Sequence, residues 1–483
     1  MSPTQDAVVR VVTSDIEQAG FGRYQYYVLA VGGLGRFYDN FWMFAISLIS
    51  LPVSREFSSH NVAWTVFAKY VGLTVGCVVW PLAADRYGRL KAFNYSLISA
   101  GVCGLLASFA HSFFLLCVLL LFVGFNIGGN QPVASMLVVE EIPPSHQHWI
   151  LYESIAWGLG SFTAAMIGWP LVAKHTCVDA VDCIPNDNKG WRYAYSIFGI
   201  LTIVMFAGSR MLPVRESPKY VASKGDFTET ESILNHIARS NGTRVAVNYT
   251  GEHSVSDNAL QGNIKASWKE RVHQSIGSTK TQVSDLLHGD LRRTTIRLWL
   301  IWALCGMGYP LFSSFLPIYL NTKASTLNQT YRDYAIQSVF SIPSGVVAGK
   351  LAQNPRLGRK GIGALGGVLT GMFMYLFILA KPSKEDTIFS SYLLYNCGIS
   401  FTTTLLYGAM YAYTPEVYPL SKRAIGSAMC SFWNRSFGLL GPLTSLTMTL
   451  SSGAPVYLSG ALFMTAGCLF LTLPLETRGV AAQ

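Results

Sequence analysis

Ionisable side chains inside long apolar runs are the residues of this sequence whose position most demands a chemical explanation. Asp39 lies near the middle of the first apolar run with Arg36 one turn before it, and Lys69 lies within the second run. An ionisable group at the centre of a bilayer costs about 2.5 to 3.5 kcal/mol, so it normally faces a cavity or a partner. We therefore predict that Asp39 binds a proton, with Glu153 as a second candidate. The alternative is a permanent ion pair of Asp39 with Arg36 or Lys69 that only packs helices.

A second group of residues could bind a solute. Arg435 keeps its charge at all relevant pH, and its planar guanidinium can pair with a carboxylate through two parallel hydrogen bonds. It could instead bond to helix-end carbonyls or balance a buried acid. Asn130 and Gln131 offer amide groups beside Pro132, where a helix must break, and Tyr309 offers an aromatic face in a run rich in glycine and proline. We predict Asn130, Gln131, Tyr309 and Arg435 as substrate-binding residues.

The elements that position these residues follow from composition. The chain has 483 residues, of which 51% are apolar and only 13% are charged, and a soluble domain carries about 25% charged residues. Its long apolar runs exclude a fibrous, disordered or disulfide-scaffold protein and predict an all-α membrane protein. A span needs about 20 residues of helix. We predict twelve spans, near 26–51, 62–83, 91–110, 112–138, 149–173, 192–212, 297–320, 331–352, 361–381, 387–413, 424–448 and 456–473.

Charge in the loops orients these spans. Basic residues gather in the loops that follow even-numbered spans, on the side shared by both termini, which predicts that this side is cytoplasmic. The net charge of +10 therefore reflects orientation and gives no reason to expect a nucleic-acid partner. On the opposite side, Cys177 and Cys183 either form a disulfide or remain two free thiols. The predicted segments are a cytoplasmic N-terminus (1–25), a first six-helix bundle (26–212), a cytoplasmic linker with short helices (213–296), a second bundle (297–473) and a cytoplasmic tail (474–483).

Charged motifs recur at equivalent loops of the two predicted bundles. Asp85-Arg86-Tyr87-Gly88-Arg89 follows span two, and Arg356-Leu357-Gly358-Arg359-Lys360 follows span eight. Acidic residues recur after spans four and ten and after spans six and twelve, which indicates a duplicated six-helix unit. Paired charges at a membrane edge can form a latch that breaks when that side opens. We predict such gating clusters from Asp85, Arg86, Arg89 and Glu140 in the first bundle, and Arg359, Glu416, Arg423 and Glu476 in the second.

These motifs and their arrangement resemble the major facilitator superfamily over nearly the whole chain. The runs Arg-Glu-Ser-Pro-Lys-Tyr (215–220) and Tyr-Thr-Pro-Glu-Val-Tyr-Pro (413–419) are similar to those of sugar porters. The run Gly-Gly-Asn-Gln-Pro-Val (128–133) is more similar to the branch of synaptic-vesicle-glycoprotein-like transporters and fungal sugar or organic-anion permeases. The resemblance implies two pseudo-symmetric six-helix bundles that rock about a central site between them.

We therefore expect a monomeric, multi-pass transporter of the plasma membrane that moves a small polar organic solute, organic anion or sugar-like, by alternating access with proton symport. The alternatives are a facilitative uniporter of the same solutes and a non-transporting receptor or trafficking protein with this fold. The sequence lacks a phosphate-binding loop and a His-Glu-x-x-His motif, and its histidines are scattered. No enzymatic activity, cofactor or metal site is expected. The expected partners are the solute, protons and the lipid bilayer.

Overall fold

The structure is a computed structural model of the full chain. It describes residues 3–57, 62–146, 149, 153–177, 183, 187–243, 283–289, 291–351, 357–382, 390–419, 422–448 and 453–476. Residues 244–282, nearly half of the predicted linker, lie outside the described residues. Within the described part the chain is almost entirely α-helical and contains no strand.

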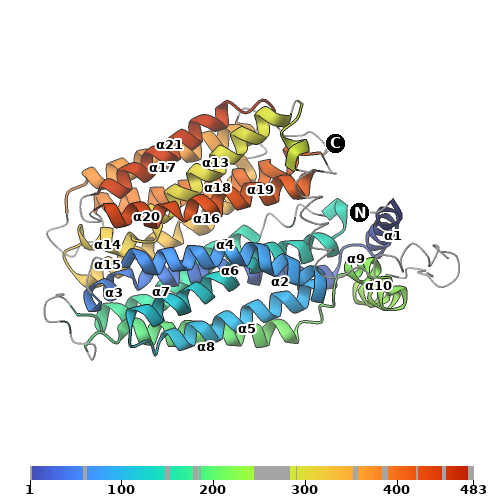
Figure 1. The fold of residues 1–483 in the computed structure, drawn as a ribbon, viewed down its shortest axis with the longest axis horizontal. Helices are drawn as coiled ribbons and strands as arrows, with labels where there is room; N and C mark the ends of the chain where they lie inside the picture. Colours follow the sequence, from blue (N-terminus) through green and yellow to red (C-terminus); the bar gives the residue numbers. More distant parts are fainter. Residues whose placement is uncertain are drawn as a thin grey trace.

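The helices form two bundles that lie one above the other in Figure 1. The lower one, here called the N half, comprises α2 (Arg23–Leu48), α3 (Ser50–Glu56), α4 (Val62–Tyr87), α5 (Arg89–Ala107), α6 (Phe113–Glu141), α7 (Glu153–Lys174) and α8 (Gly190–Met211). The upper one, the C half, comprises α13 (Leu291–Ser313), α14 (Leu316–Asn321), α15 (Leu327–Val339), α16 (Ser341–Leu351), α17 (Gly358–Leu379), α18 (Ser391–Val417), α19 (Arg423–Gly438), α20 (Leu440–Thr447) and α21 (Ala454–Leu471).

Eight of the described helices, α4 to α8, α13, α17 and α21, are long and apolar enough to cross a membrane on their own. The other four predicted spans correspond to α18 and to three broken helices: α2 with α3, α15 with α16, and α19 with α20. The interruption between α2 and α3 recurs between α13 and α14, at the same place in each half. Large apolar side chains such as Phe114, Leu379 and Leu394 are exposed on the outside of the bundle, as lipid-facing residues are.

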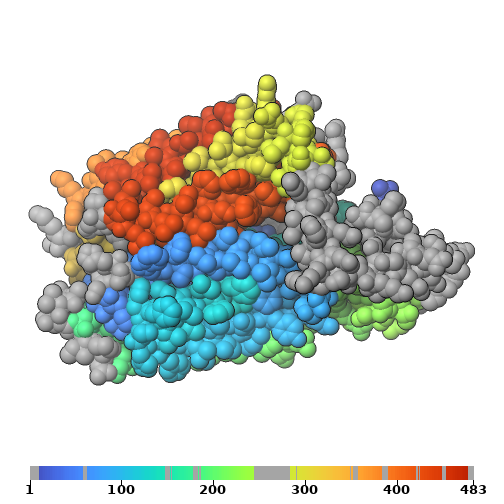
Figure 2. Space-filling view, viewed as in Figure 1, coloured from blue at the N-terminus to red at the C-terminus, as the bar shows by residue number. Residues whose placement is uncertain are grey.

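Small residues let the helices approach closely. A Cβ on Gly72 or Gly76 of α4 would collide with backbone oxygens of α6, and one on Gly124 or Gly128 of α6 would collide with backbone oxygens of α4. The two glycine pairs therefore face each other across one interface, as in small-residue packing of membrane helices. Figure 2 shows the two halves packed against each other along their length, with α19 and α20 against the N half.

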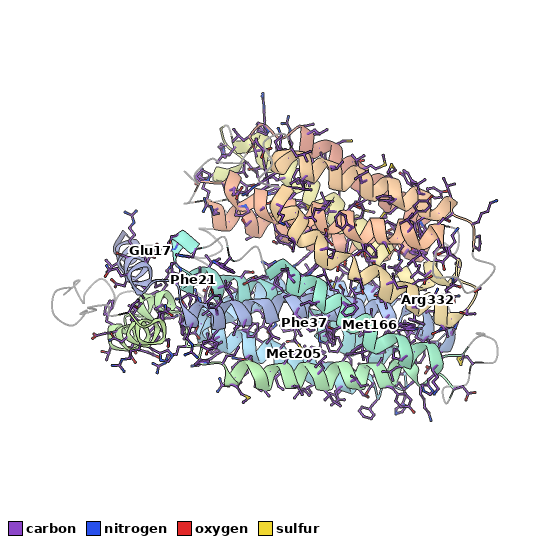
Figure 3. The ribbon with its side chains drawn as sticks, turned by 180° about the vertical axis from the view of Figure 1, so that it is seen from behind. Glu17, Phe21, Phe37, Met166, Met205 and Arg332 are labelled. Atoms are coloured by element: carbon purple, nitrogen blue, oxygen red, sulfur yellow. A yellow bond between two sulfur atoms is a disulfide. The ribbon has the colours of Figure 1, made fainter. Side chains whose placement is uncertain are left out.

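The two ends of the bundle differ. The linker end carries α1 (Pro3–Ala19), α9 (Pro218–Ser223) and α10 (Phe227–Asn241), and the disulfide end carries Cys177 and Cys183. In Figure 3, Glu17 and Phe21 mark the linker end and Arg332 marks the disulfide end. Helix α1 packs its buried residues Val12, Ile16 and Ala19 toward α9 and α10. The linker end is thus a small helical layer built on the N half.

Candidate functional site

A central cavity lies between the two halves. It contains about 510 Å³ of atom-free space when its open side is included. Helices α2 and α7 supply its N-half wall, and α13 to α18 with α21 supply the C-half wall. Its lining is aromatic and polar and is uncharged in the described residues: Asn40, Phe44, Trp157, Ser161, Tyr309, Phe312, Ser313, Leu316, Gln337, Ser341, Met374, Ile399, Ser400, Thr403, Thr404 and Phe463.

The predicted proton site lies directly behind this wall. Asp39 is 9% exposed and precedes Asn40, which lines the cavity. Trp157 of α7 connects them, because its indole is hydrogen-bonded to the Asp39 carboxylate and its backbone carbonyl accepts a hydrogen bond of 2.7 Å from Asn40 Nδ2. A change of charge on Asp39 would therefore act on a residue in the cavity wall.

Three cations face Asp39, but none forms a contact ion pair with it in the described part of the chain. In order of electrostatic influence they are Arg435, Arg36 and Lys69. Arg36 Nε instead lies 3.4 Å from Glu153 Oε2, and Lys69 Nζ donates to Ser314 Oγ at 3.3 Å and lies over the ring of Tyr70. The alternative of a direct ion pair of Asp39 with Arg36 or Lys69 is thus not formed in this structure. Asp39 is therefore a buried acid that lies in the field of these cations and is hydrogen-bonded to one indole.

Arg435 links the two halves instead of lining the cavity. Its Nη2 donates to Gln131 Oε1 of α6 at 3.3 Å, and Gln131 Nε2 donates to the Tyr411 hydroxyl of α18 at 3.3 Å. Arg36 of α2 stacks on the ring of Tyr411, 5.7 Å from its centroid. Arg435, Gln131 and Arg36 therefore form a polar bridge across the interface between the halves.

The four predicted substrate residues end up in different environments. Tyr309 lines the cavity, whereas Gln131 and Arg435 belong to the bridge. Asn130 is fully buried and donates to Ser96 Oγ at 2.8 Å, so it packs α6 on α5 and does not line the cavity. A substrate-binding role of Asn130 stays a prediction, because in this structure the residue lies on the face of α6 that meets α5.

Sequence reasoning missed the amides and hydroxyls that do line the cavity. Asn40 and Gln337 lie within apolar runs, and Thr402-Thr403-Thr404 is a polar run inside a predicted span. Uncharged polar residues at that depth are a usable signal, because they also need partners in a membrane.

The N-half charge cluster forms at the linker end. Arg89 lies 3.1 Å from Asp85 and 3.3 Å from Glu140. Glu216, which follows α8, accepts from the backbone N–H groups of Arg89 at 2.7 Å and Leu90 at 3.2 Å and so caps the start of α5. Burial raises the pKa of Glu216, against the opposing effect of these amide hydrogen bonds. The Arg86 side chain lies over the Tyr87 ring and forms no ion pair with a described residue.

The C half repeats this arrangement. Arg359 pairs with Glu416, and Glu476 accepts from the backbone N–H groups of Arg359 at 2.8 Å and Lys360 at 3.2 Å, which caps the start of α17. Arg423 does not join the cluster, because two of its guanidinium nitrogens are buried without a hydrogen-bond partner among the described residues. Each cluster therefore lies within one half of the molecule.

The halves are joined by hydrogen bonds toward the disulfide end. Ser47 Oγ donates to the Ser313 carbonyl at 2.5 Å, and the Tyr334 hydroxyl donates to the Phe44 carbonyl at 3.1 Å. Arg55 of α3 donates to the Cys177 carbonyl at 2.5 Å and to Asn321 Oδ1 of the C half at 3.5 Å. In the structure Cys177 and Cys183 are bonded to each other.

The family model of the Major Facilitator Superfamily matches residues 37–442, which is most of the chain. The chain belongs to this superfamily. It is 33% identical to "MFS siderochrome iron transporter 1" of Ceriporiopsis subvermispora over its whole length and 93% of that protein. It is 26% identical to a synaptic vesicle 2-related protein of Bos taurus over its whole length and 83% of that protein. The predicted family and its synaptic-vesicle-like branch are thereby confirmed.

The fold is also that of solved transporters of the superfamily. The structure of the proton:xylose symporter XylE bound to 6-bromo-6-deoxy-D-glucose matches with a TM-score of 0.67 at 15% identity, covering 95% of this chain and 98% of the symporter. Two six-helix bundles are thus confirmed as the fold class of this major facilitator transporter, which is a multi-pass membrane protein.

Proposed function

We propose that this transporter moves a small polar organic solute, organic anion or sugar-like, across a membrane by alternating access, coupled to the movement of a proton. The observation that carries the proposal is the position of Asp39: a carboxylate buried in the N half, hydrogen-bonded to Trp157, which lines the central cavity. The relatives' names cover cargoes as different as an iron siderochrome and xylose, so they do not select a solute.

The coupling works through charge balance. When Asp39 takes a proton from one side of the membrane, its carboxylate loses its charge and no longer attracts Arg435 and Arg36. The two arginines can then pair with other groups. Arg435 and Arg36 lie in the bridge between the halves, so protonation changes the relative stability of the two access states. Release of the same proton to the other side restores the carboxylate. One proton moving down about 100 mV supplies about 2.3 kcal/mol, or about 40-fold accumulation of the solute.

The proposal includes the orientation. The linker end, with α1, α9, α10 and the segment after α21, is placed on the cytoplasmic side of the plasma membrane, and the disulfide end on the oxidising side, where a disulfide persists. The segment boundaries at residues 25, 212, 296 and 473 are proposed with it.

The test begins with a thermal-shift screen of the purified protein against sugars, monocarboxylates, aromatic acids, phosphate and polyols at two pH values. Uptake of the best ligand into proteoliposomes under a proton gradient is then compared for the unsubstituted protein, Asp39→Asn and Asp187→Asn. Asp187 is exposed at the disulfide end, so its variant controls for a lost carboxylate. We expect Asp39→Asn to retain exchange and to lose uphill accumulation. Normal accumulation by Asp39→Asn would disprove the proton role.

A further inference from the structure

Two amide side chains in the wall of the cavity have polar atoms without partners. Asn40 is 1% exposed, and the bond from its Nδ2 to the Trp157 carbonyl fixes the orientation of its amide. Its Oδ1 has no hydrogen-bond partner among the described residues. Gln337 is 3% exposed, and its Nε2 likewise has none. Buried polar atoms are nearly always paired, so an unpaired acceptor and an unpaired donor in one cavity indicate places for a ligand.

Three hydroxyl groups of the wall already donate to backbone carbonyls. Ser161 Oγ donates to the Gly158 carbonyl at 2.8 Å, Ser341 Oγ to the Ser338 carbonyl at 2.6 Å, and Thr404 Oγ1 to the Ser400 carbonyl at 2.9 Å. Their protons are therefore committed to their own helices. Among the described lining residues, the buried side-chain atoms without a hydrogen-bond partner belong to the two amides, and these lie in opposite halves, Asn40 in α2 and Gln337 in α15.

The cavity offers a carboxylate no counter-ion. None of its described lining residues is charged. Arg435 is bonded to Gln131, and Lys69 to Ser314, so neither cation faces the cavity wall as a free partner. An ionised carboxylate moved from water into such a place would lose its hydration without a compensating cation, which is strongly unfavourable. The remaining wall, including Phe44, Phe312 and Phe463, suits an apolar or aromatic body.

We infer that the solute is an uncharged molecule with an apolar or ring-shaped body, which donates a hydrogen bond to Asn40 Oδ1 and accepts one from Gln337 Nε2. Carboxamides and polyhydroxylated rings have this combination of groups. Gln337 is then a specificity-determining residue. This inference rests on the proposed transport function, because it names the class of solute that the same cavity takes. A ligand held from both halves also brings them together around itself.

The test compares matched neutral and anionic probes on the unsubstituted, full-length protein. Benzamide is compared with benzoate, and glucose with glucuronate, by titration of intrinsic tryptophan fluorescence and by thermal shift at neutral pH. We expect at least one of the two neutral probes to bind at least about tenfold more tightly than its matched carboxylate. The carboxylate would lose one buried hydrogen bond or bury an unpaired charge, and either cost corresponds to about this factor. Equal or tighter binding of the carboxylate, or no binding by either neutral probe, would overturn the inference.

A second arm assigns the binding to Gln337. Gln337→Met keeps the size of the side chain and removes its amide, and we expect it to weaken binding of the neutral probe by about tenfold. Gln18→Met makes the same change at an exposed position of α1 and should leave binding unchanged. Binding of a carboxylate that is lost in Arg435→Gln and kept in Gln337→Met would place the solute at the bridge and refute the inference.

The outcomes for the two proposals differ. A protein that binds the neutral probe through Gln337 but shows no accumulation dependent on Asp39 keeps the solute class and loses the proton coupling. A protein that accumulates a carboxylate in a way that depends on Asp39 keeps the coupling and loses the solute class. The ligand pairs are measured on the unsubstituted protein, so the comparison that decides the solute class does not require any variant to fold.

Discussion

The Glu216 carboxylate tests whether the linker end is held by hydrogen bonds or by charge. One of its oxygens, Oε1, accepts from the backbone N–H groups of Arg89, Leu90 and Ser217. Glu216→Ala leaves these groups without that acceptor, and removal of a helix cap costs about 0.5 to 2 kcal/mol. With three N–H groups on one oxygen we expect the upper end, about 2 kcal/mol. Glu216→Gln keeps an acceptor oxygen, and we expect a change within about 0.5 kcal/mol.

The expectation for Gln follows from the electrostatics of the site. Burial raises the pKa of Glu216, and the amide hydrogen bonds only partly offset that shift. The folded protein therefore binds this proton more tightly than the unfolded chain does. Protonation of Glu216 stabilises the fold fully below the ordinary pKa of 4.5, and this contribution is lost as the pH rises through the folded pKa. The unsubstituted protein should gain stability relative to Glu216→Gln as the pH falls through this window.

Thermal unfolding of the purified full-length protein, followed by tryptophan fluorescence, measures both effects. For a unit of about 150 to 250 residues that unfolds cooperatively, such as the N half, a loss of 1 kcal/mol in the free energy of unfolding lowers Tm by about 2 to 4 °C. Glu216→Ala should therefore lower Tm by about 4 to 8 °C. Glu17→Ala, an exposed carboxylate on α1, is the matched control and should not shift it. A Gln variant as unstable as the Ala variant would show that charge holds the cap and would refute the reasoning.

Two further predictions concern packing inside the bundle. Gly72→Leu drives a side chain into the α6 backbone and should cost about 3 kcal/mol or more, seen as loss of monodisperse protein on size exclusion. Gly208→Ala is the control and should be tolerated, because a Cβ added there meets no neighbouring atom within 4 Å. Arg36→Gln leaves the Glu153 carboxylate buried without its cation and should cost about 3 kcal/mol in thermal unfolding. Arg36→Gln with Glu153→Gln should recover most of that loss, and failure to recover would show that the pair is not what Arg36 stabilises.

The spans could be predicted from the sequence because a bilayer demands about 20 apolar residues per helix, and that length is visible in the chain. The interruptions were harder to place. In the seventh span the structure ends α13 at Ser313, between Pro310 and Pro317, and places Pro317 in the first turn of α14. In the linker, Thr228 and Glu231 are spaced like a capping box, but Asp226 caps α10. Boundaries depend on single hydrogen bonds, which composition does not encode.

The sequence predicted how deep in the membrane the residues of the candidate site lie, but not which face of each helix they occupy. The burial of Asp39 follows from its place in the span, whereas its partners depend on which face of α2 meets which helix. Arg36 lies one turn before Asp39 and turned out to face Glu153 of α7, which the sequence places more than a hundred residues away. Asn40 was overlooked beside its charged neighbour although it is the residue that reaches the cavity.

The placement of the bonds between the halves limits how a proton could drive transport. Toward the disulfide end, Ser47 bonds to Ser313, Tyr331 to Leu48, Tyr334 to Phe44 and Arg55 to Asn321. Each such bond contributes about 0.5 to 1.5 kcal/mol net, so opening this end breaks interactions worth a few kcal/mol in total. One proton moving down about 100 mV supplies about 2.3 kcal/mol. The four bonds together contribute about 2 to 6 kcal/mol, so one proton offsets them only at the lower end of this range, and above it the opening requires new contacts elsewhere. The charge clusters at the linker end each lie within one half, so their ion pairs do not have to break when the halves separate at that end.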